Sequence, residues 1–439
     1  MRARSTGLES TRALQRVLYR SAKQQPNRKF HALYDKVARS DVLARAFSEV
    51  RANRGAPGID SVSITDVETS GVEQFLQDLA TALRDRTYRP APLRRVHIPK
   101  AGRPGETRPL SIPTVRDRTV MTAAKIVLEP IFEADFRPAS FGYRPKRSAH
   151  QALDVIRIEA NRGRDWVLDA DITDCFGSIS HEALMAQLAR RVFDKEMLKL
   201  VRAWVKQGVL EGGVVTDPVS GTPQGSPISP LLSNIALNVL DAEWEQQGRR
   251  IGVLVRYSDD FVILCASKER AEQARQMVMS ILSRLGLQLN PDKTGIVCLT
   301  HGNQGFDFLG FHLHKVESWR WRGKWYLQRW PSRAALVAVR ADIKAMTEPS
   351  QVGRSLDAVV GDLNRTLRGW HGYFRHGSSS KAFSRINEYV HLRLATYMSR
   401  KHGRKGLGWT GCYDYAWLKT TGIYRLRGTV HSEAVHAQR

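Results

Sequence analysis

The sequence contains little that could build a zinc site, a disulfide framework or a membrane span. Only four of its 439 residues are cysteines, and no two of them form a C-x-x-C pair. Such spacing argues against structural zinc and disulfides and is typical of a protein in a reducing cytosol. No apolar run approaches the ~18 residues of a spanning helix, and the N-terminus has no apolar signal segment. We therefore expect a soluble, cytoplasmic protein with no membrane partner.

Acidic residues are also scarce, with 43 Asp and Glu against 68 Lys and Arg, a net charge of +25 and a pI near 10.3. Residues 1–100 carry +9 and residues 311–410 carry +13, whereas residues 101–310 carry only +1. A generally basic, solvated surface would spread this excess evenly. Since so much self-repulsion is unfavourable without a polyanionic partner, the pattern indicates a nearly neutral catalytic centre flanked by regions that bind nucleic acid.

Length and periodicity predict two or three domains of mixed helix and strand, and an apolar fraction of 42% is sufficient to form a core. Helices are expected over residues 7–50, 70–86, 117–133, 148–160, 181–193, about 230–246 and 268–285, and over much of 332–400. Strands are expected at residues 96–99, 108–112, 166–172, 251–257 and 261–266. The first two of these strands form a hairpin with a basic tip at residues 101–107.

Carboxylates interrupt two of the expected strand regions. Asp171 closes the apolar strand 166–172, and Asp259 with Asp260 lies at the turn of the hairpin 251–266. Charges between apolar strands are unfavourable unless they are paired or bind a metal. Nucleotidyl transfer uses carboxylates to hold two divalent ions, and hard oxygen ligands favour Mg²⁺. The alternative is structural, because Asp-Asp is common in ordinary β-turns.

Three segments resemble the motifs of reverse transcriptases. Tyr257-Ser258-Asp259-Asp260 is similar to their Y-x-D-D box, and residues 171–176 (DITDCF) are similar to their first catalytic motif, an Asp followed five residues later by an aromatic. Residues 221–235 (GTPQGSPISPLLSNI) match the template- and nucleotide-contacting motif almost letter for letter. The motifs occur in the family's order, and the resemblance extends over roughly residues 50–400.

The resemblance implies an α+β fold: a right-hand polymerase, whose fingers and palm form a β-sheet with flanking helices, followed by an α-helical thumb and maturase domain. It implies that Asp171, Asp259 and the backbone carbonyl of Ile172 hold two Mg²⁺ ions, with Asp260 beside them as a third catalytic carboxylate. Phe176 would favour dNTP substrates by excluding a 2′-OH. The sequence departs from the family at Ser258, where alanine is usual, and we expect activity to survive.

Other residues are implied to contact the nucleotide. Lys100 and Arg108 flank the basic hairpin, where cations would neutralise the incoming triphosphate. Gln224 and Gly225 would lie against the nascent base pair, since glycine allows close backbone approach. Lys293 resembles a motif lysine near the phosphates and is a candidate general acid for pyrophosphate.

The basic and aromatic C-terminal region resembles the thumb and maturase domain of group II intron proteins. Interleaved aromatic and basic side chains stack on unpaired bases and contact phosphates, although some of these rings are expected to be core residues. The predicted RNA-binding residues are Arg368, Trp370, Tyr373 and Arg375. Residues 54–60 likewise resemble the N-terminal extension of this group. The Cys/His-rich endonuclease domain of many relatives is expected to be absent.

The resemblance divides the chain into four parts: an N-terminal extension with the start of the fingers (1–92), fingers and palm (93–315), thumb and maturase domain (316–410), and a basic tail (411–439). The implied function is that of a group II intron reverse transcriptase and maturase. Its partners would be the intron RNA, an RNA template and a DNA primer or target. The protein itself would be a monomer or a homodimer. The alternatives are a splicing cofactor with an idle polymerase site and a domesticated, CRISPR- or defence-associated reverse transcriptase.

Overall fold

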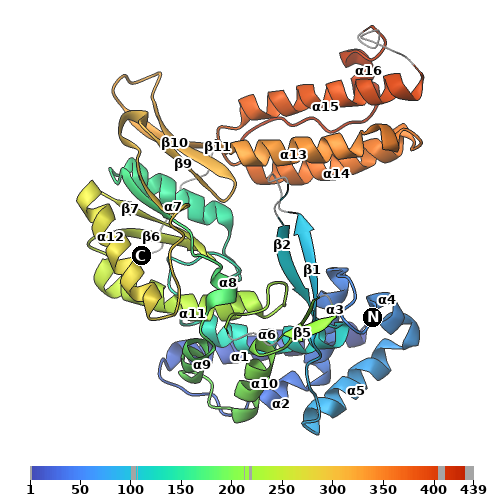
Figure 1. Cartoon of the computed structure of the whole chain (residues 1–439), viewed down its shortest axis with the longest axis vertical. Coiled ribbons are helices and arrows are strands. Elements are labelled where there is room, and N and C mark those ends of the chain that lie inside the picture. The colour runs from blue at the N-terminus through green and yellow to red at the C-terminus, as the bar shows by residue number, and fades with distance from the viewer. Residues whose placement is uncertain are drawn as a thin grey trace. The chain divides into compact units, whose positions relative to one another are not determined.

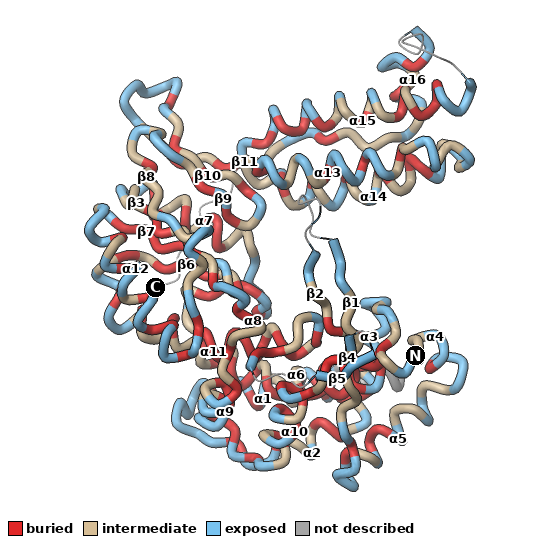
Figure 2. Tube along the Cα trace, viewed as in Figure 1, coloured by how far each residue is buried: buried red, intermediate tan, exposed pale blue. Residues whose placement is uncertain are grey.

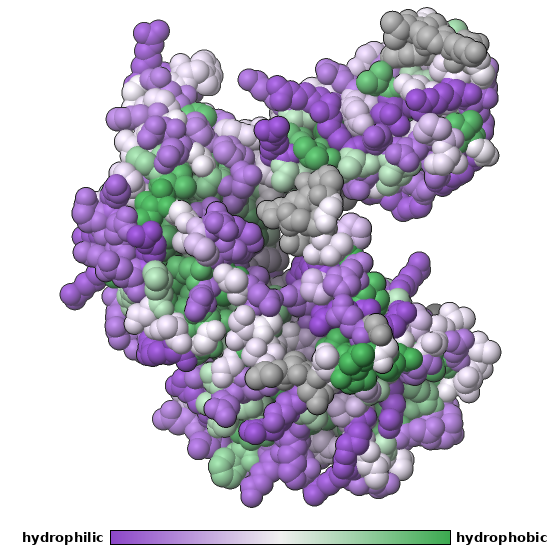
Figure 3. Space-filling model, viewed as in Figure 1, coloured by the Kyte–Doolittle hydropathy of each residue, from purple (hydrophilic) through white to green (hydrophobic). Residues whose placement is uncertain are grey.

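The structure is a computed structural model that describes residues 2–99, 105, 107–211, 213–216, 220–403 and 411–430. These residues fall into two compact units (Figure 1). The first unit is drawn from residues 1–99, 107–148 and 168–296, and the second from residues 100–106, 149–167 and 297–439. Hydrophilic residues cover much of the visible face of each unit (Figure 3), as the charge composition predicts. Among the described residues, no helix has the length and apolarity needed to cross a bilayer.

The first unit combines two sheets with helices on their faces. Its helices are α1 (Arg2–Gln24), α2 (Tyr34–Val37), α3 (Ser40–Ala52), α4 (Ile64–Ser70), α5 (Val72–Arg84), α6 (Val115–Glu133), α8 (Cys175–Ser178), α9 (His181–Ala189), α10 (Lys195–Val205), α11 (Ser229–Glu243), the π-helical turn η1 (Trp244–Gly248) and α12 (Lys268–Ser283). One sheet has the order β2-β1-β4-β5, formed by β1 (Leu93–Pro99), β2 (Thr107–Ile112), β4 (Val209–Glu211) and β5 (Val214–Thr216). The other has the order β6-β7-β3-β8, formed by β3 (Trp166–Ala170), β6 (Gly252–Tyr257), β7 (Asp260–Cys265) and β8 (Gly295–Cys298). Of β3 and β8, the first unit includes residues 168–170 and 295–296.

The sheet β6-β7-β3-β8 is the element that positions the acidic residues. Its strand β7 is buried along the whole run Phe261–Cys265, and Val167 and Leu168 of β3 are also fully buried. Helix α12 packs on β6 and β7 (Figure 1). Because apolar side chains cover this sheet, the strand ends that carry its carboxylates are held in a fixed register.

Most of the predicted elements of the first unit are confirmed, but the single helical stretch expected over residues 7–50 is wrong. The chain leaves α1 after Gln24 and forms two further helices, α2 and α3. Pro26 lies in the gap; it has no backbone N–H to continue a helix. Phe30 instead exchanges backbone hydrogen bonds with Arg191 and Phe193 at the end of α9, so this segment is used for a tertiary contact.

The second unit contains a small sheet that the sequence analysis did not predict. Strands β9 (Gly305–Phe308), β10 (Phe311–Glu317) and β11 (Trp325–Pro331) form an antiparallel sheet in the order β11-β10-β9. The remaining elements are α7 (Ala149–Asn161), η2 (Thr300–Gly302), α13 (Arg333–Met346), η3 (Pro349–Gln351), α14 (Leu356–Phe374), α15 (Ser380–Lys401) and α16 (Tyr415–Thr420). The helical region expected over residues 332–400 is confirmed and begins at Arg333.

Helices α13, α14 and α15 form a bundle with a shared apolar core. Buried and exposed residues alternate along each helix (Figure 2), as an amphipathic helix requires. The buried residues of the bundle include Ile343 of α13, Leu363 and Leu367 of α14, and Phe383 and Leu394 of α15. Ser332 and Ser355 accept hydrogen bonds from the first turns of α13 and α14 and so mark where these helices begin.

Candidate active site

The predicted acidic hairpin is confirmed as the pair β6–β7. The strands pair antiparallel from Gly252 opposite Cys265 to Tyr257 opposite Asp260, so Ser258 and Asp259 form the two-residue turn. Ser258 adopts a left-handed conformation with φ +64°. Such a conformation costs a non-glycine residue about 1–3 kcal/mol, and it persists where surrounding contacts determine it.

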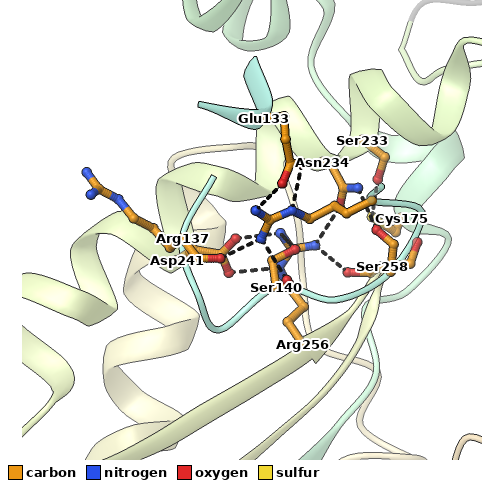
Figure 4. A network of polar contacts seen from close by, with 11 residues as sticks. Glu133, Arg137, Ser140, Cys175, Ser233, Asn234, Asp241, Arg256 and Ser258 are labelled. Carbon is orange, nitrogen blue, oxygen red and sulfur yellow. Dashed lines mark hydrogen bonds and ion pairs between the residues drawn. The ribbon is translucent and has the colours of Figure 1, made fainter. Parts of the chain in front are cut away.

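Those contacts come from a buried arginine behind the turn (Figure 4). Arg256 has 0% exposure, and its Nε donates to Asp241 Oδ1 at 2.8 Å. One terminal nitrogen, Nη1, donates to the Ser258 carbonyl at 2.7 Å and to Asn234 Oδ1 at 3.0 Å, and the other, Nη2, donates to Ser140 Oγ at 2.9 Å. The guanidinium thus ties α11 directly to the residue before Asp259.

A glycine on the segment between α6 and α7 completes this support. Asn234 Nδ2 donates to the Gly142 carbonyl at 2.8 Å. A Cβ at position 142 would lie 2.5 Å from the backbone nitrogen of Ser258, so only glycine allows this approach. Neither Gly142 nor Arg256 is among the site residues predicted from the sequence. A lone arginine inside the apolar strand Leu254–Tyr257 is a signal that could have identified the second of them.

Asp171 directly follows β3, and two backbone contacts hold its position. The Asp171 carbonyl accepts from Asn290 N at 2.8 Å, and Ile172 forms an antiparallel bridge with Leu289. The Asp171 carboxylate forms an ion pair with Lys293, with Oδ2 and Nζ 2.7 Å apart. The structure therefore brings Lys293, predicted from its motif position, to the same acidic site.

The electrostatics of the site show that its three carboxylates interact. Desolvation by the surrounding protein and the negative charges of Asp259 and Asp171 raise the pKa of Asp260 to about 7, while Lys293 opposes the shift. Repulsion of this kind is relieved by a bound cation, and all the expected donors are oxygens, which suits a hard divalent ion. Within the described part of the chain, no group of three or more His, Cys, Asp or Glu side chains is arranged as a metal cluster. The Asp171 carboxylate faces Lys293 in this structure.

The loop before α11 lies against the β2 strand and the first catalytic motif. Arg108 Nε donates to Gln224 Oε1 at 3.0 Å, and Gln224 Nε2 donates to Asp174 Oδ1 at 3.3 Å. Gly225 has φ +105°, and a Cβ there would lie 2.7 Å from the Ser111 carbonyl. The structure therefore brings together Arg108, Gln224 and Gly225, three of the predicted nucleotide-binding residues.

Phe176 belongs to the same group of elements. It lies in α8 and is largely buried, and its carbonyl accepts a hydrogen bond from the backbone of Thr222. A cleft of about 380 Å³ opens beside it, with Asp174 and Gln224 in its lining. Its lining also includes His97 and Glu211, whose Nε2 and Oε1 lie 2.7 Å apart. Lys100, the remaining predicted nucleotide contact, lies outside the described residues.

The predicted RNA-binding residues lie on or next to α14 in the second unit. Arg368 and Arg375 are exposed. The Trp370 ring packs against Phe374 with centroids 4.7 Å apart, and the Tyr373 hydroxyl donates to the Leu309 carbonyl at 2.8 Å. The two aromatic rings are thus engaged in internal packing, and their role in RNA binding stays a prediction.

Comparisons with known proteins agree with this geometry. Residues 98–313 match the family described as reverse transcriptase (RNA-dependent DNA polymerase), and residues 336–417 match the group II intron, maturase-specific domain. Protein YkfC of Escherichia coli (strain K12) is 34% identical over 70% of this chain and 88% of its own length. The group II intron-encoded protein LtrA of Lactococcus lactis subsp. cremoris is 29% identical over 70% of this chain and 60% of its own length. A solved partial Cas6-RT-Cas1–Cas2 complex is 28% identical with a TM-score of 0.38, covering 58% of this chain and 42% of that one, a likeness too low to support an argument.

Proposed function

Because the chain belongs to the family of group II intron-encoded reverse transcriptases with a maturase domain, we propose that it copies intron RNA into cDNA. We also propose that it binds the same RNA to assist splicing and mobility. The observation that carries the polymerase proposal is the meeting of Asp171, Asp259 and Asp260 in the same compact unit as the Arg108–Gln224 pair.

Two Mg²⁺ ions would be held by the carboxylates of Asp171 and Asp259 and by the Ile172 carbonyl. When bound, such ions lower the pKa of the attacking 3′-OH and neutralise the charge on the leaving pyrophosphate. The environment of Asp260 supports this proposal: after desolvation, the negative charges of Asp259 and Asp171 are the next causes of its raised pKa, so the three carboxylates interact.

The chain's own side chains would orient the substrate. Arg108, with Lys100, would neutralise the triphosphate, and Lys293 would donate a proton to the departing pyrophosphate. Gln224 and Gly225 would lie under the new base pair, and Phe176 would exclude ribonucleotides. The matched ranges support a division into fingers and palm (93–315) and thumb with maturase (316–410), with residues 1–92 and 411–439 on either side.

Primer extension tests the proposal directly. Purified protein is given an RNA template with an annealed DNA primer, dNTPs and Mg²⁺, beside the variant Asp259→Ala. We expect full-length cDNA from the wild type and none from the variant. If neither protein makes cDNA although both bind RNA tightly in low salt, the polymerase proposal fails. That result would favour the splicing cofactor with an idle site, which the intact acidic turn currently argues against.

A further inference from the structure

The β10–β11 hairpin ends in a segment of unusual composition, Ser318–Lys324, which we call the tryptophan loop. Its sequence is SWRWRGK, with two tryptophans, three basic residues and no acid. Trp319 is 91% exposed and Trp321 is 57% exposed. Single exposed apolar side chains are common on protein surfaces, but two tryptophans interleaved with cations on one loop are not explained by packing.

Hydrogen bonds within the loop fix its conformation. Ser318 N donates to the Lys324 carbonyl at 2.8 Å, and Trp321 N donates to Ser318 Oγ at 3.2 Å. Gly323 has φ +79°, and its N–H donates to Glu317 Oε1 at 2.7 Å. The turn is therefore held by its own backbone and by the end of β10, so the exposure of Trp319 follows from a defined geometry.

The two rings differ in what surrounds them. Trp321 lies between two cations, with Arg320 Cζ 5.2 Å and Lys324 Nζ 5.6 Å from its ring centroid. Such contacts occupy a ring and orient the basic groups around it. Trp319 has nearly its whole surface in solvent. The loop thus presents the exposed ring of Trp319 together with the basic groups that surround Trp321.

We infer that the tryptophan loop binds unpaired nucleotides of structured RNA, with Trp319 stacking on a base and Arg320 and Arg322 contacting phosphates. This inference deepens the proposed function and rests on it. RNA fits better than a protein or lipid partner because cations alternate with the rings and the chain as a whole carries +25. Unpaired RNA fits better than duplex because only an unstacked base exposes its face to a ring.

The test measures binding of the full chain to a labelled RNA stem-loop, with a blunt duplex of the same stem and anionic phospholipid vesicles as competing probes. Trp319→Leu removes the aromatic ring and keeps apolar volume, whereas Trp319→Phe keeps an aromatic ring. We expect Trp319→Leu to weaken stem-loop binding roughly 5- to 100-fold, the range for one base–aromatic stack, and Trp319→Phe to recover most of that loss. Neither variant should change binding to the duplex.

The arginines have a different expected signature. The double variant Arg320→Gln/Arg322→Gln should reduce the slope of log affinity against log salt by about 0.7 for each lost phosphate contact, whereas Trp319→Leu should leave that slope unchanged. The matched control is Met279→Ala, which removes another exposed apolar side chain (54% exposed) from α12 and should behave as the wild type.

Equal affinities of the wild type and Trp319→Leu for the stem-loop would overturn the inference. So would an equal loss on the duplex, or a loss confined to the vesicles. Primer extension by the wild type is measured in the same preparations, so that a failure of the loop inference can be distinguished from a failure of the polymerase proposal. If the wild type makes cDNA and the loop variants bind normally, only the tryptophan loop is wrong. If the wild type makes no cDNA, the polymerase proposal fails whatever the loop does.

Discussion

Two hairpin tips of this protein carry opposite charges and are held in opposite ways. The acidic tip, Tyr257–Asp260, is fixed from behind by Arg256, which reaches residues far away in the sequence on α11 and before α7. Among the described residues, the hydrogen bonds that fix the tryptophan loop are those between its own residues and Glu317. Catalytic carboxylates must be placed to within a fraction of an ångström, and so need rigid support from the core. A ring that stacks on bases must above all be exposed to solvent, and it needs less rigid support from the core.

The largest effect should come from breaking the long-range support of the acidic tip. Arg256→Met leaves Asp241 buried and unpaired, which should lower the free energy of unfolding by about 3–5 kcal/mol. It also removes the donor to the Ser258 carbonyl, so kcat should fall more than KM rises. Urea unfolding and steady-state primer extension measure the two effects.

The control for that experiment is a second buried arginine in the same unit, one that pairs with a partly exposed carboxylate. Arg191 is 3% exposed and pairs with Asp135 at 2.9 Å, and it also donates to backbone carbonyls between α1 and α2. Arg191→Met should also lower the free energy of unfolding, since it leaves buried backbone carbonyls without their donor, and should keep the kcat of the folded enzyme. Equal kcat values for the two variants under conditions where both are folded would show that Arg256 only stabilises the fold.

A smaller effect is expected in substrate choice, where the two tips should also differ. Stacking on Trp319 tolerates any base, whereas the acidic site is predicted to select the sugar through Phe176. Phe176→Val opens space beside the 2′ position and should raise ribonucleotide use relative to dNTP use about 10- to 100-fold, the usual range for a steric pocket contact. Single-nucleotide incorporation with matched rNTP and dNTP pairs measures this ratio. An unchanged ratio would assign Phe176 to the core alone.

The side chains that pack against the two hairpins should contribute differently to stability at acidic pH. His150 packs against Phe311 of β10, and burial, with the positive charges of His376 and Arg329, lowers its pKa to about 4 while Asp154 opposes the shift. The unfolded chain then binds more protons than the folded one between about pH 6.5 and pH 4. The contribution of neutral His150 to the free energy of unfolding is therefore fully present above pH 6.5, and it is lost as the pH falls from 6.5 to 4.

His150→Phe should therefore flatten the decrease in unfolding free energy between about pH 7 and pH 5, as measured by urea titration at several pH values. His150→Gln is the polar counterpart and should flatten it as well, since neither residue titrates. A slope identical to that of the wild type in both variants would show that His150 does not contribute to acid sensitivity.

The smallest effect is expected at Ser258, where the backbone conformation matters more than the side chain. Ser258→Ala keeps the same left-handed strain and the same carbonyl, so activity and stability should change by no more than about 0.5 kcal/mol. Ser258→Val places a β-branched residue at φ +64°, which should cost about 1–3 kcal/mol and displace the turn. Primer extension by the two variants at equal folded concentration compares them. A severe loss in Ser258→Ala would point to a direct role for the hydroxyl.

The sequence by itself predicted the features that depend on neighbours along the chain. The β6–β7 hairpin with its acids at the turn was predicted from alternation and turn residues, and most of the helices from their apolar spacing, although the break between α1 and α3 and the helix α10 were not predicted. The motif order also predicted the family that the comparisons show. Side-chain period and turn chemistry are local properties, which is why a single sequence is sufficient to recognise them.

Only the tertiary structure decided which side chains support these features and which are free. Trp370 and Trp319 both lie in basic, aromatic segments, yet the first is partly buried against Phe374 and the second is almost fully exposed to solvent. Arg256 looks in sequence like one more basic residue, but it is the buried partner of Asp241. Whether a side chain is buried depends on which other element packs against it. The periodicity of one segment does not contain that information.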